Sequence, residues 1–508
     1  YPTLAAAVTA INGGTHTGSI TVNVDAGHTE TLAGRINLTA TGTMTEPIII
    51  QKAGAGANPA LTAYTGVNTP TSAERDGMFS LSGSDWVTID GINLQENPAN
   101  TDLTTWMEYG YGLFKNSDTD GCQNNTIKNC AITLNRDNVI PGSGVWHPGS
   151  NGIVVLWCSA TSDTGIAPTT PDGSNSFNKF YSNTIQNVQH GITFMAFAAP
   201  TPFTLADTGN DVGGYSASTG NTIVNFGGGA ATMASADAVF INNQWGINCS
   251  YNTINNNNGA GVNHPNILYG IWCNLSSTST SATINNNNVT VKGGGTTQVV
   301  AAIRNELGAT PAGNTVSISN NTITGEYLTA TTGGFYGIWN SAAQANLIMN
   351  GNTVSNMSYS SATLTGTGVV YGIFNGASNA GMTVNVRNNT VSNINRTGTA
   401  GGTTIGIFTV GVGGMNVTIN SNTVENMSVD GTGAASIIYG IQTTNGTIVV
   451  DSNLVNNLAC LKMTGIGTLY GIYNINAPSN ENYNYNTVSN LTHNGTGTTY
   501  GIYAFTAT

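Results

Sequence analysis

The chain has 508 residues, of which only 7% are charged, against roughly 25% in typical soluble proteins. Its 65 Gly and 69 Asn exclude helical bundles and coiled coils, which are rich in Ala, Glu, Lys and Leu. A hydrophobic content of 39% argues against charge-driven disorder. The 12 basic residues are outnumbered by 24 acidic ones, so no nucleic-acid-binding face is expected. No apolar run reaches the roughly 18 residues of a membrane span.

The first residues predict a short helix. Pro2 to Ile11 is rich in Ala, has Pro near its start and is followed by Gly13 and Gly14, which are helix start and stop signals. We expect residues 1–18 to cap the end of a β-structure, because exposed strand edges promote aggregation. The first strands are predicted at Ser19–Val24, Ile48–Gln51 and Trp86–Leu94.

The first half of the chain combines strands with long insertions. We expect residues 19–250 to form one region, which holds 18 of the 24 acidic residues. Residues 251–508 are a more uniform array of repeats of about 31–37 residues. The longest insertions are predicted at Gln95–Tyr111, Asn135–Asn151, Ser159–Ser176 and Ala196–Gly220.

A short motif repeats along most of the chain: Asn, Thr, Val or Ile, any residue, Asn. From Asn183 onward its copies are 31 to 38 residues apart, a spacing typical of solenoid proteins. We expect the first Asn of each copy to form one structural ladder along the molecule. The predicted ladder consists of Asn125, Asn183, Asn221, Asn252, Asn287, Asn321, Asn352, Asn389, Asn422, Asn453 and Asn486.

A second motif, Tyr-Gly-Ile, recurs in step with the first, at positions such as Tyr269, Tyr336 and Tyr500. Between the two motifs lies an alternating run such as Val417-Thr418-Ile419, whose period of two indicates a strand. Three short strands per repeat, joined by links too short for a helix, predict an all-β fold. The predicted fold is a right-handed parallel β-helix of about 12–15 turns.

The Asn residues supply a mechanism for the corners of such a fold. Asn tolerates the left-handed backbone conformation better than other residues with a side chain, and Gly325 replaces it in one copy. Stacked Asn side chains also hydrogen-bond along a column. Cys122, Cys130 and Cys249 occupy inward positions of the same frame and are interpreted as small buried hydrophobic residues. A disulfide or metal site is the alternative, but no His or Cys spacing typical of zinc is present.

An aromatic stripe is predicted on the outside of the Tyr-Gly-Ile strands. If Tyr and Ile point inward, the residue after Ile points outward. This stripe is interpreted as a contact surface for another copy or a glycan, or as a layer covered by loops such as Thr363–Val370. The candidate contact residues are Trp272, Trp339, Phe374, Phe408, Tyr473 and Tyr503.

The Asn ladder and the strand Trp86-Val87-Thr88-Ile89-Asp90-Gly91-Ile92 resemble the parallel β-helix proteins of the pectin lyase-like superfamily. The Asn/Thr/Gly-rich repeats are also similar to large secreted or surface repeat proteins of the Bacteroidota type. The resemblance covers nearly the whole chain and implies the fold, but the fold hosts lyases, hydrolases, adhesins and stalks.

Two function classes follow from this resemblance. The enzyme hypothesis needs two nearby carboxylates, and the only close acidic pair near a predicted turn of the solenoid is Asp118 and Asp120. His190-Gly191 resembles part of a polygalacturonase motif whose other parts are missing. We therefore expect a non-catalytic, secreted or cell-surface structural protein, such as a stalk, adhesin or filament subunit.

This function carries its own expectations about partners. No catalytic residue, cofactor or metal is expected. Self-association is expected, because the chain stops shortly after Tyr500 begins another repeat and no cap is visible. A glycan is the other partner considered.

Overall fold

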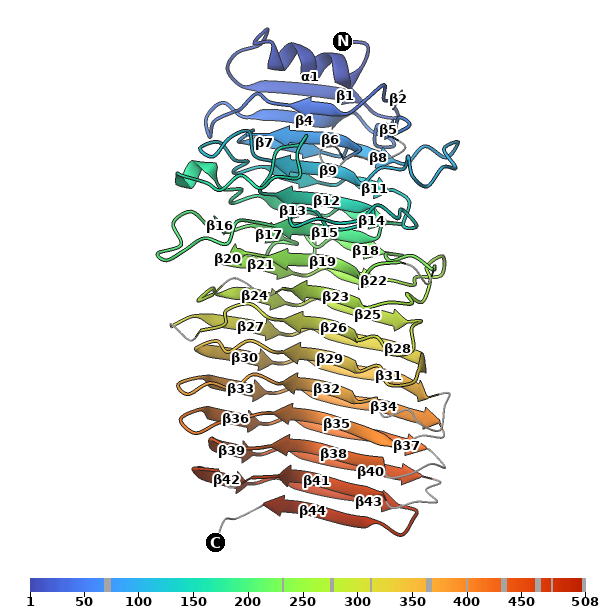
Figure 1. The fold of residues 1–508 in the computed structure, drawn as a ribbon, viewed down its shortest axis with the longest axis vertical. Helices are drawn as coiled ribbons and strands as arrows, with labels where there is room; N and C mark the ends of the chain where they lie inside the picture. The colour runs from blue at the N-terminus through green and yellow to red at the C-terminus, as the bar shows by residue number, and fades with distance from the viewer. Residues whose placement is uncertain are drawn as a thin grey trace. The chain divides into compact units, whose positions relative to one another are not determined.

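The computed structural model describes residues 1–67, 75–230, 233–274, 278–310, 313–361, 368–398, 401–430, 436–461, 467–476 and 478–504. The chain divides into two compact units, Tyr1–Gly261 and Val262–Thr508. Each unit is a parallel β-solenoid in which every turn supplies one strand to each of three sheets, called A, B and C (Figure 1). The described residues make about 13 turns, within the predicted range.

Unit 1 begins with helix α1 (Leu4–Asn12), close to the predicted position. Thr3 caps the helix by accepting a hydrogen bond from the Ala6 amide (3.1 Å), and Glu30 accepts one from the Leu4 amide (2.7 Å). The helix buries Leu4, Ala7, Val8 and Ile11, and it lies beside the first strands (Figure 1). It therefore covers the apolar start of the unit 1 solenoid with one amphipathic face.

The three sheets of unit 1 contain short parallel strands in register. Sheet A contains β1 (Ile20–Asp25), β4 (Ile48–Ala53), β7 (Val87–Asp90), β10 (Thr126–Lys128), β13 (Lys179–Tyr181), β17 (Asp211–Val212) and β21 (Ile247–Ser250). Sheet B contains β2 (Thr29–Thr31), β5 (Ala60–Thr62), β8 (Asn93–Gln95), β11 (Ala131–Thr133), β14 (Thr184–Gln186), β18 (Thr222–Val224) and β22 (Thr253–Asn255). Sheet C contains β3 (Ile36–Leu38), β6 (Gly77–Ser82), β9 (Tyr109–Phe114), β12 (Asn151–Leu156), β15 (His190–Met195) and β19 (Ala236–Asn242). The insertions add a 3-10 turn (Pro171–Gly173) and the pair β16 (Asp207–Thr208) and β20 (Gln244–Trp245).

Unit 2 repeats the same three-strand turn with longer strands. Sheet A contains β24 (Ala282–Asn285), β27 (Thr315–Ser319), β30 (Asn346–Asn350), β33 (Thr383–Arg387), β36 (Asn416–Asn420), β39 (Thr447–Asp451) and β42 (Asn480–Asn484). Sheet B contains β25 (Asn288–Gly293), β28 (Thr322–Ala330), β31 (Thr353–Ser361), β34 (Thr390–Gly398), β37 (Thr423–Asp430), β40 (Leu454–Leu461) and β43 (Thr487–His493). Sheet C contains β23 (Leu268–Cys273), β26 (Val300–Asn305), β29 (Phe335–Asn340), β32 (Val370–Asn375), β35 (Gly402–Thr409), β38 (Ser436–Thr443), β41 (Thr468–Asn474) and β44 (Thr498–Ala504).

The core of each unit lies between the sheets and is filled by the inward-facing residues of every strand. Val386, Ile419, Val424 and Ile441 are fully buried, as the alternating pattern predicts. All six cysteines are buried. Their burial agrees with the interpretation of Cys122, Cys130 and Cys249 as small apolar core residues.

The ladder Asn residues precede the strands of sheet B and bond from turn to turn. In unit 2 the backbone amide and Nδ2 of Asn389 both donate to Oδ1 of Asn422, at 3.0 and 2.9 Å. The same pair of bonds recurs from Asn287 through Asn486 in unit 2 and, in unit 1, from Asn183 to Asn221 and from Asn221 to Asn252. Each ladder side chain thus accepts a hydrogen bond from the buried backbone amide of the ladder Asn in the preceding turn.

The assignment of Asn125 to this ladder is wrong. Asn125 precedes β10 in sheet A, whereas Asn183 precedes β14 in sheet B. Asn125 bonds to Asn178 (Nδ2 to Oδ1, 3.1 Å), which belongs to a second column at another corner of the solenoid. In this turn the ladder position next to Asn183 is occupied by Cys130 instead of an Asn. The backbone amide of Cys130 donates to Asn183 Oδ1. Two copies of the motif that differ only at the fourth residue, Lys128 and Gln186, thus fold at two different corners.

The corner mechanism also needs correction. The left-handed residue is the one immediately before the ladder Asn, such as Asn388 with φ 55°. The last Asn of the motif is left-handed as well, for example Asn393 with φ 55°, where strand β34 bulges. Gly325 is not left-handed. Strand β28 has one residue fewer than β31 at this point, and Gly325 pairs with the inward-facing Met357 rather than with the last Asn of the motif, Asn356.

Candidate functional site

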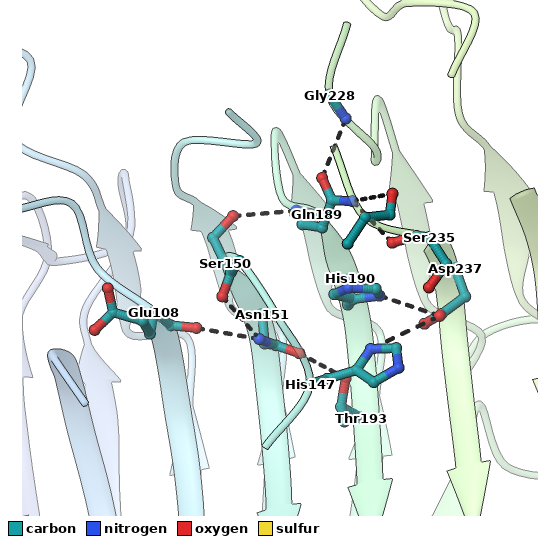
Figure 2. A network of polar contacts seen from close by, with 12 residues as sticks. Glu108, His147, Ser150, Asn151, Gln189, His190, Thr193, Gly228, Ser235 and Asp237 are labelled. Carbon is teal, nitrogen blue, oxygen red and sulfur yellow. Dashed lines mark hydrogen bonds and ion pairs between the residues drawn. The ribbon is translucent and has the colours of Figure 1, made fainter. Parts of the chain in front are cut away.

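The outer face of sheet C in unit 1 carries a column of polar side chains at the start of its strands. The strands pair in register, so that Tyr109 aligns with Asn151, Asn151 with His190, and His190 with Asp237. Figure 2 shows Asn151, His190 and Asp237 side by side on neighbouring strands. The solenoid therefore brings together residues that are some 40 positions apart in the sequence.

His147 completes this column from the loop between β11 and β12. Its Nδ1 lies 3.8 Å from Asp237 Oδ2, and His190 Nδ1 lies 3.1 Å from the same oxygen (Figure 2). The two imidazole rings meet edge to face, with centroids 3.9 Å apart. His190 and Asp237 are fully buried, and the His147 side chain is only 10% exposed. Two imidazoles and one carboxylate thus converge beneath the surface.

The loop that carries His147 is held in place on both sides of this residue. The Gly149 amide donates to the Ile140 carbonyl (2.8 Å), and the Ile140 amide donates to Asn138 Oδ1 (2.9 Å). Trp146 packs against Tyr109 in an apolar cluster on the outer face of sheet C. The His147 ring stacks on Phe240, with ring centroids 4.1 Å apart.

The electrostatics of the cluster are dominated by burial. The pKa of His147 is lowered to about 3, mainly by burial and in part by the neighbouring His190, while Asp237 opposes the shift. His147 is therefore a neutral imidazole at pH 7, with Nδ1 directed towards the carboxylate of Asp237. A neutral imidazole and a carboxylate are both suited to share a proton or to bind a metal ion.

A second buried carboxylate lies further along the network. Glu108 accepts hydrogen bonds from the Asp76 amide at Oε2 (2.6 Å) and from Asn138 Nδ2 at Oε1 (3.2 Å). Asn151 Nδ2 contacts the Glu108 carbonyl (3.4 Å), as drawn in Figure 2. The pKa of Glu108 is raised to about 8, mainly by burial and in part by the Asp76 charge, while the hydrogen bonds from the Asp76 amide and from Asn138 oppose the shift. Glu108 is only 2% exposed, so its carboxylate is shielded from solvent.

The acidic pair considered in the enzyme hypothesis lies elsewhere in unit 1. Asp118 and Asp120 belong to a tight turn closed by the bridge between Ser117 and Asp120. Asp120 accepts a hydrogen bond from Asn116 (2.8 Å), and Asp118 accepts one from Thr169 (3.0 Å). Asp118 is exposed and Asp120 half-buried, and both take part in holding the turn.

In unit 2 the outer face of sheet C carries aromatic residues. The Tyr residues of the Tyr-Gly-Ile motif lie on this face together with the predicted stripe residues. Tyr371 and Phe374 are both half-buried and stack at 4.7 Å, so the prediction that Tyr points inward with Ile is wrong. The strand bends at Gly372, where two consecutive residues, Gly372 and Ile373, face inward. A Cβ on Gly372 would lie 2.5 Å from the core residue Val391.

The predicted stripe residues therefore form one of two adjacent aromatic columns. Rings stack face to face from turn to turn: Tyr336 on Tyr371 at 5.2 Å, Phe374 on Phe408 at 5.2 Å and Tyr439 on Tyr470 at 5.1 Å. These separations match the spacing of neighbouring strands, about 4.8 Å. The expected stripe residues Trp272, Trp339, Phe374, Phe408, Tyr473 and Tyr503 all take part in ring contacts.

A charged group interrupts the columns near their start. The Arg304 guanidinium lies 4.0 Å from the centroid of the Trp339 ring and donates to Glu306 (2.6 Å) and to the Tyr269 hydroxyl (2.6 Å). Trp272 Nε1 donates to the same Glu306 carboxylate (3.0 Å). The segment Thr363–Thr367, which the sequence analysis considered as a cover for the stripe, lies outside the described residues.

The His147, His190 and Asp237 cluster was missed from the sequence. Its members belong to no metal-binding spacing, and His190 was considered only as part of an incomplete enzyme motif. The available signal was positional: His190-Gly191-Ile192 occupies the place of Tyr-Gly-Ile, with His where Tyr stands in unit 2. A polar residue at that repeated position marks a departure from the aromatic columns.

Comparisons with known proteins identify solved structures that are similar to this chain, but no family to which it belongs. No family model matches the chain, and no curated protein matches it. An alginate lyase structure from Paenibacillus sp. str. FPU-7 is similar at 13% identity, covering 76% of this chain and 97% of that one, with a TM-score of 0.31. The GH136 lacto-N-biosidase of Eubacterium ramulus matches at 11% identity and a TM-score of 0.41, over 83% of this chain. This chain spans 60% of that enzyme's length.

An adhesin is similar to the same degree. The Streptococcus pneumoniae surface protein and adhesin PfbA matches at 10% identity, covering 98% of this chain and 95% of that one, with a TM-score of 0.32. At such identities the likeness concerns the fold alone. Among the described residues, no helix is long and apolar enough to cross a membrane.

Proposed function

We propose that this chain is a non-catalytic structural solenoid that works outside the cell and associates with further copies through the aromatic columns of unit 2. The observation that carries the proposal is that these rings stack face to face on the rings of the neighbouring turns. Tyr470, for example, stacks on Tyr439 and on Tyr500, both at 5.1 Å, with interplanar angles of 9° and 6°. The ring faces are occupied by neighbouring turns, so an external partner would meet the edges of the half-buried rings, such as Tyr371, Phe374 and Tyr473.

This use of the rings favours a protein partner over a sugar. A pyranose stacks on the face of an aromatic ring, and those faces are already used between turns. A row of aromatic edges is instead an apolar ridge, and Tyr and Trp are enriched in protein interfaces. The ridge follows the repeat, so a second copy offers the same spacing of about 4.8 Å between contacts. Burial of Glu108, His190 and Asp237 adds to the argument, because none of these acid–base groups reaches solvent.

The association part of the proposal is tested with the double substitution Trp339→Ala and Phe374→Ala. Analytical ultracentrifugation and electron microscopy of the purified chain should show assemblies for the unmodified protein and dispersed, folded units for the variant. The matched control is Tyr485→Ala, because Tyr485 is 86% exposed in unit 2 and does not belong to the columns. If the double variant melts at a lower temperature with unchanged association, the columns are a covered structural layer and the proposed interface is wrong.

The competing function is a polysaccharide lyase or hydrolase. Its candidate residues are Asp118 and Asp120, the acidic pair of the turn described above. We expect no release of reducing sugar or unsaturated product when the chain is incubated with pectins, alginates and plant glucans, because the carboxylates of Asp118 and Asp120 are engaged in holding their own turn. Activity that disappears in Asp118→Asn or Asp120→Asn would establish the enzyme and overturn the non-catalytic proposal.

A further inference from the structure

The cluster of His147, His190 and Asp237 is the strongest concentration of ligating side chains among the described residues. The three residues offer one ligand atom each, and these atoms all lie within 4.8 Å of one another. We propose that this cluster is a binding site for a divalent transition-metal ion, Zn²⁺ by preference, which fastens the loop between β11 and β12 to sheet C.

The distances fit a tetrahedral ion. Zinc binds imidazole nitrogen and carboxylate oxygen at about 2.0–2.1 Å, so two ligands of one ion are about 3.3 Å apart. The distances from Asp237 Oδ2 to the two Nδ1 atoms, 3.1 Å to His190 and 3.8 Å to His147, bracket this value. In Figure 2 both imidazoles direct a nitrogen to the same carboxylate. The ligand atoms of the two imidazoles lie within 4.8 Å of each other, and binding one ion would bring them to a similar separation of about 3.3 Å.

The donor set selects the class of ion. Two imidazole nitrogens and one carboxylate suit zinc and its first-row neighbours, whereas Ca²⁺ and Mg²⁺ prefer six or more oxygen ligands. A fourth position remains for water, as in zinc sites with three protein ligands. The inference goes beyond the proposed function, because a cross-linking ion needs no catalytic role.

The scaffold holds the three ligands with different rigidity. His190 and Asp237 face each other in register on the adjacent strands β15 and β19. The His190 amide donates to the Ser150 carbonyl (2.9 Å), which ties its strand to the end of the loop. His147 comes from the loop itself and is positioned by the Phe240 ring. An ion at this point therefore joins an irregular segment to two regular strands.

The test uses the full chain without a histidine tag. After treatment with a chelator, the protein is titrated with Zn²⁺ and with Co²⁺ and analysed for metal content, visible absorption and melting temperature. We expect one ion per chain, a four-coordinate Co²⁺ spectrum, and a melting temperature that rises with Zn²⁺ because the ion binds the folded state. His147→Ala and Asp237→Asn should weaken binding by roughly 100-fold or more and abolish the thermal shift.

The control variant is His16→Ala, because His16 is exposed and lies far from the cluster in the sequence; its binding should equal that of the unmodified chain. His147→Ala changes only the loop ligand, so circular dichroism should show that its solenoid is intact. The proposal is overturned if the unmodified chain binds no more Zn²⁺ than Asp237→Asn, or if Zn²⁺ leaves its melting temperature unchanged. In either case the three residues form a hydrogen-bonded His–Asp–His group with a purely protein role.

Discussion

Single Asn side chains connect one turn of the solenoid to the next. Asn389 Oδ1 accepts hydrogen bonds from the amide and Nδ2 of Asn352, at 2.8 and 3.0 Å, and its own Nδ2 donates to the Met349 carbonyl (2.7 Å) and to Asn422 (2.9 Å). No other common side chain of this size both donates and accepts in this way, since Asp lacks the donor and Leu lacks both. The ladder therefore depends on the amide group itself.

Replacing Asn389 by Ala should destabilise the chain by about 3 kcal/mol, because several buried donors and acceptors lose their partners. The measurement is the melting temperature together with hydrogen exchange of the Asn352 amide. Asn393→Gly is the matched control: Asn393 is exposed, and its left-handed backbone suits Gly. Equal effects of the two substitutions would contradict the ladder's energetic role.

Glu108 predicts a pH dependence of stability. Its pKa is about 8 in the folded chain, raised from an ordinary 4.5 by burial. Because the folded state holds this proton more tightly than the unfolded state, the stabilising contribution is present at low pH and is lost as pH rises from about 4.5 to about 8. Glu108→Gln imitates the protonated acid, so its free energy of unfolding should lose this slope.

Chemical denaturation across that pH range measures the effect. The unmodified chain and Glu108→Gln should have similar midpoints at the acidic end, and the variant should be the more stable at the alkaline end. The exposed Glu46→Gln serves as the control and should follow the unmodified chain. Parallel curves for all three proteins would show that Glu108 does not titrate in this window.

At the scale of the element, the Tyr-Gly-Ile strand is built around its glycine. A Cβ at Gly372 would lie 2.5 Å from Val391 Cγ1 and 2.6 Å from the Gly406 carbonyl oxygen of the next turn. Glycine therefore permits close packing of sheet C on the core and lets two consecutive residues face inward. The same bend brings Tyr371 to the outer face, beside Phe374.

Gly372→Ala should accordingly destabilise unit 2 by at least about 2 kcal/mol, because the methyl group overpacks a filled core. Gly501→Ala is a closely matched control, since it changes the same position of the motif and its methyl group would meet nothing within 4 Å. Thermal unfolding of the two variants decides the matter. A Gly372→Ala chain as stable as Gly501→Ala would mean that the strand bends for another reason.

At the scale of the molecule, each turn contacts mainly the turns before and after it. In such arrays the stability is close to a sum of the stabilities of single turns and of their interfaces. Hydrogen exchange of Gly372→Ala should therefore show lost protection in β29, β32 and β35, which carry the neighbouring turns of sheet C. Distant strands of unit 2 should keep their protection.

The sequence by itself determined the class of fold and its period. Repeats of 31 to 38 residues, alternating apolar runs and recurring Asn predict a parallel solenoid of three strands per turn, because these features depend on local backbone preference and on a burial pattern that repeats. The helix near the N-terminus was predicted for the same reason. Burial of Val424 and Ile441 follows from the period of two.

Only the tertiary structure decided which corner each motif occupies and which side chains meet. Asn125 and Asn183 begin copies of the same motif yet lie in different columns, because the register between turns depends on the insertions between them. The outward Tyr371 depends on a two-residue bend at Gly372 that no simple alternation encodes. His147, His190 and Asp237 meet because stacking places separate turns within a few ångströms, and such proximity is a property of the folded chain.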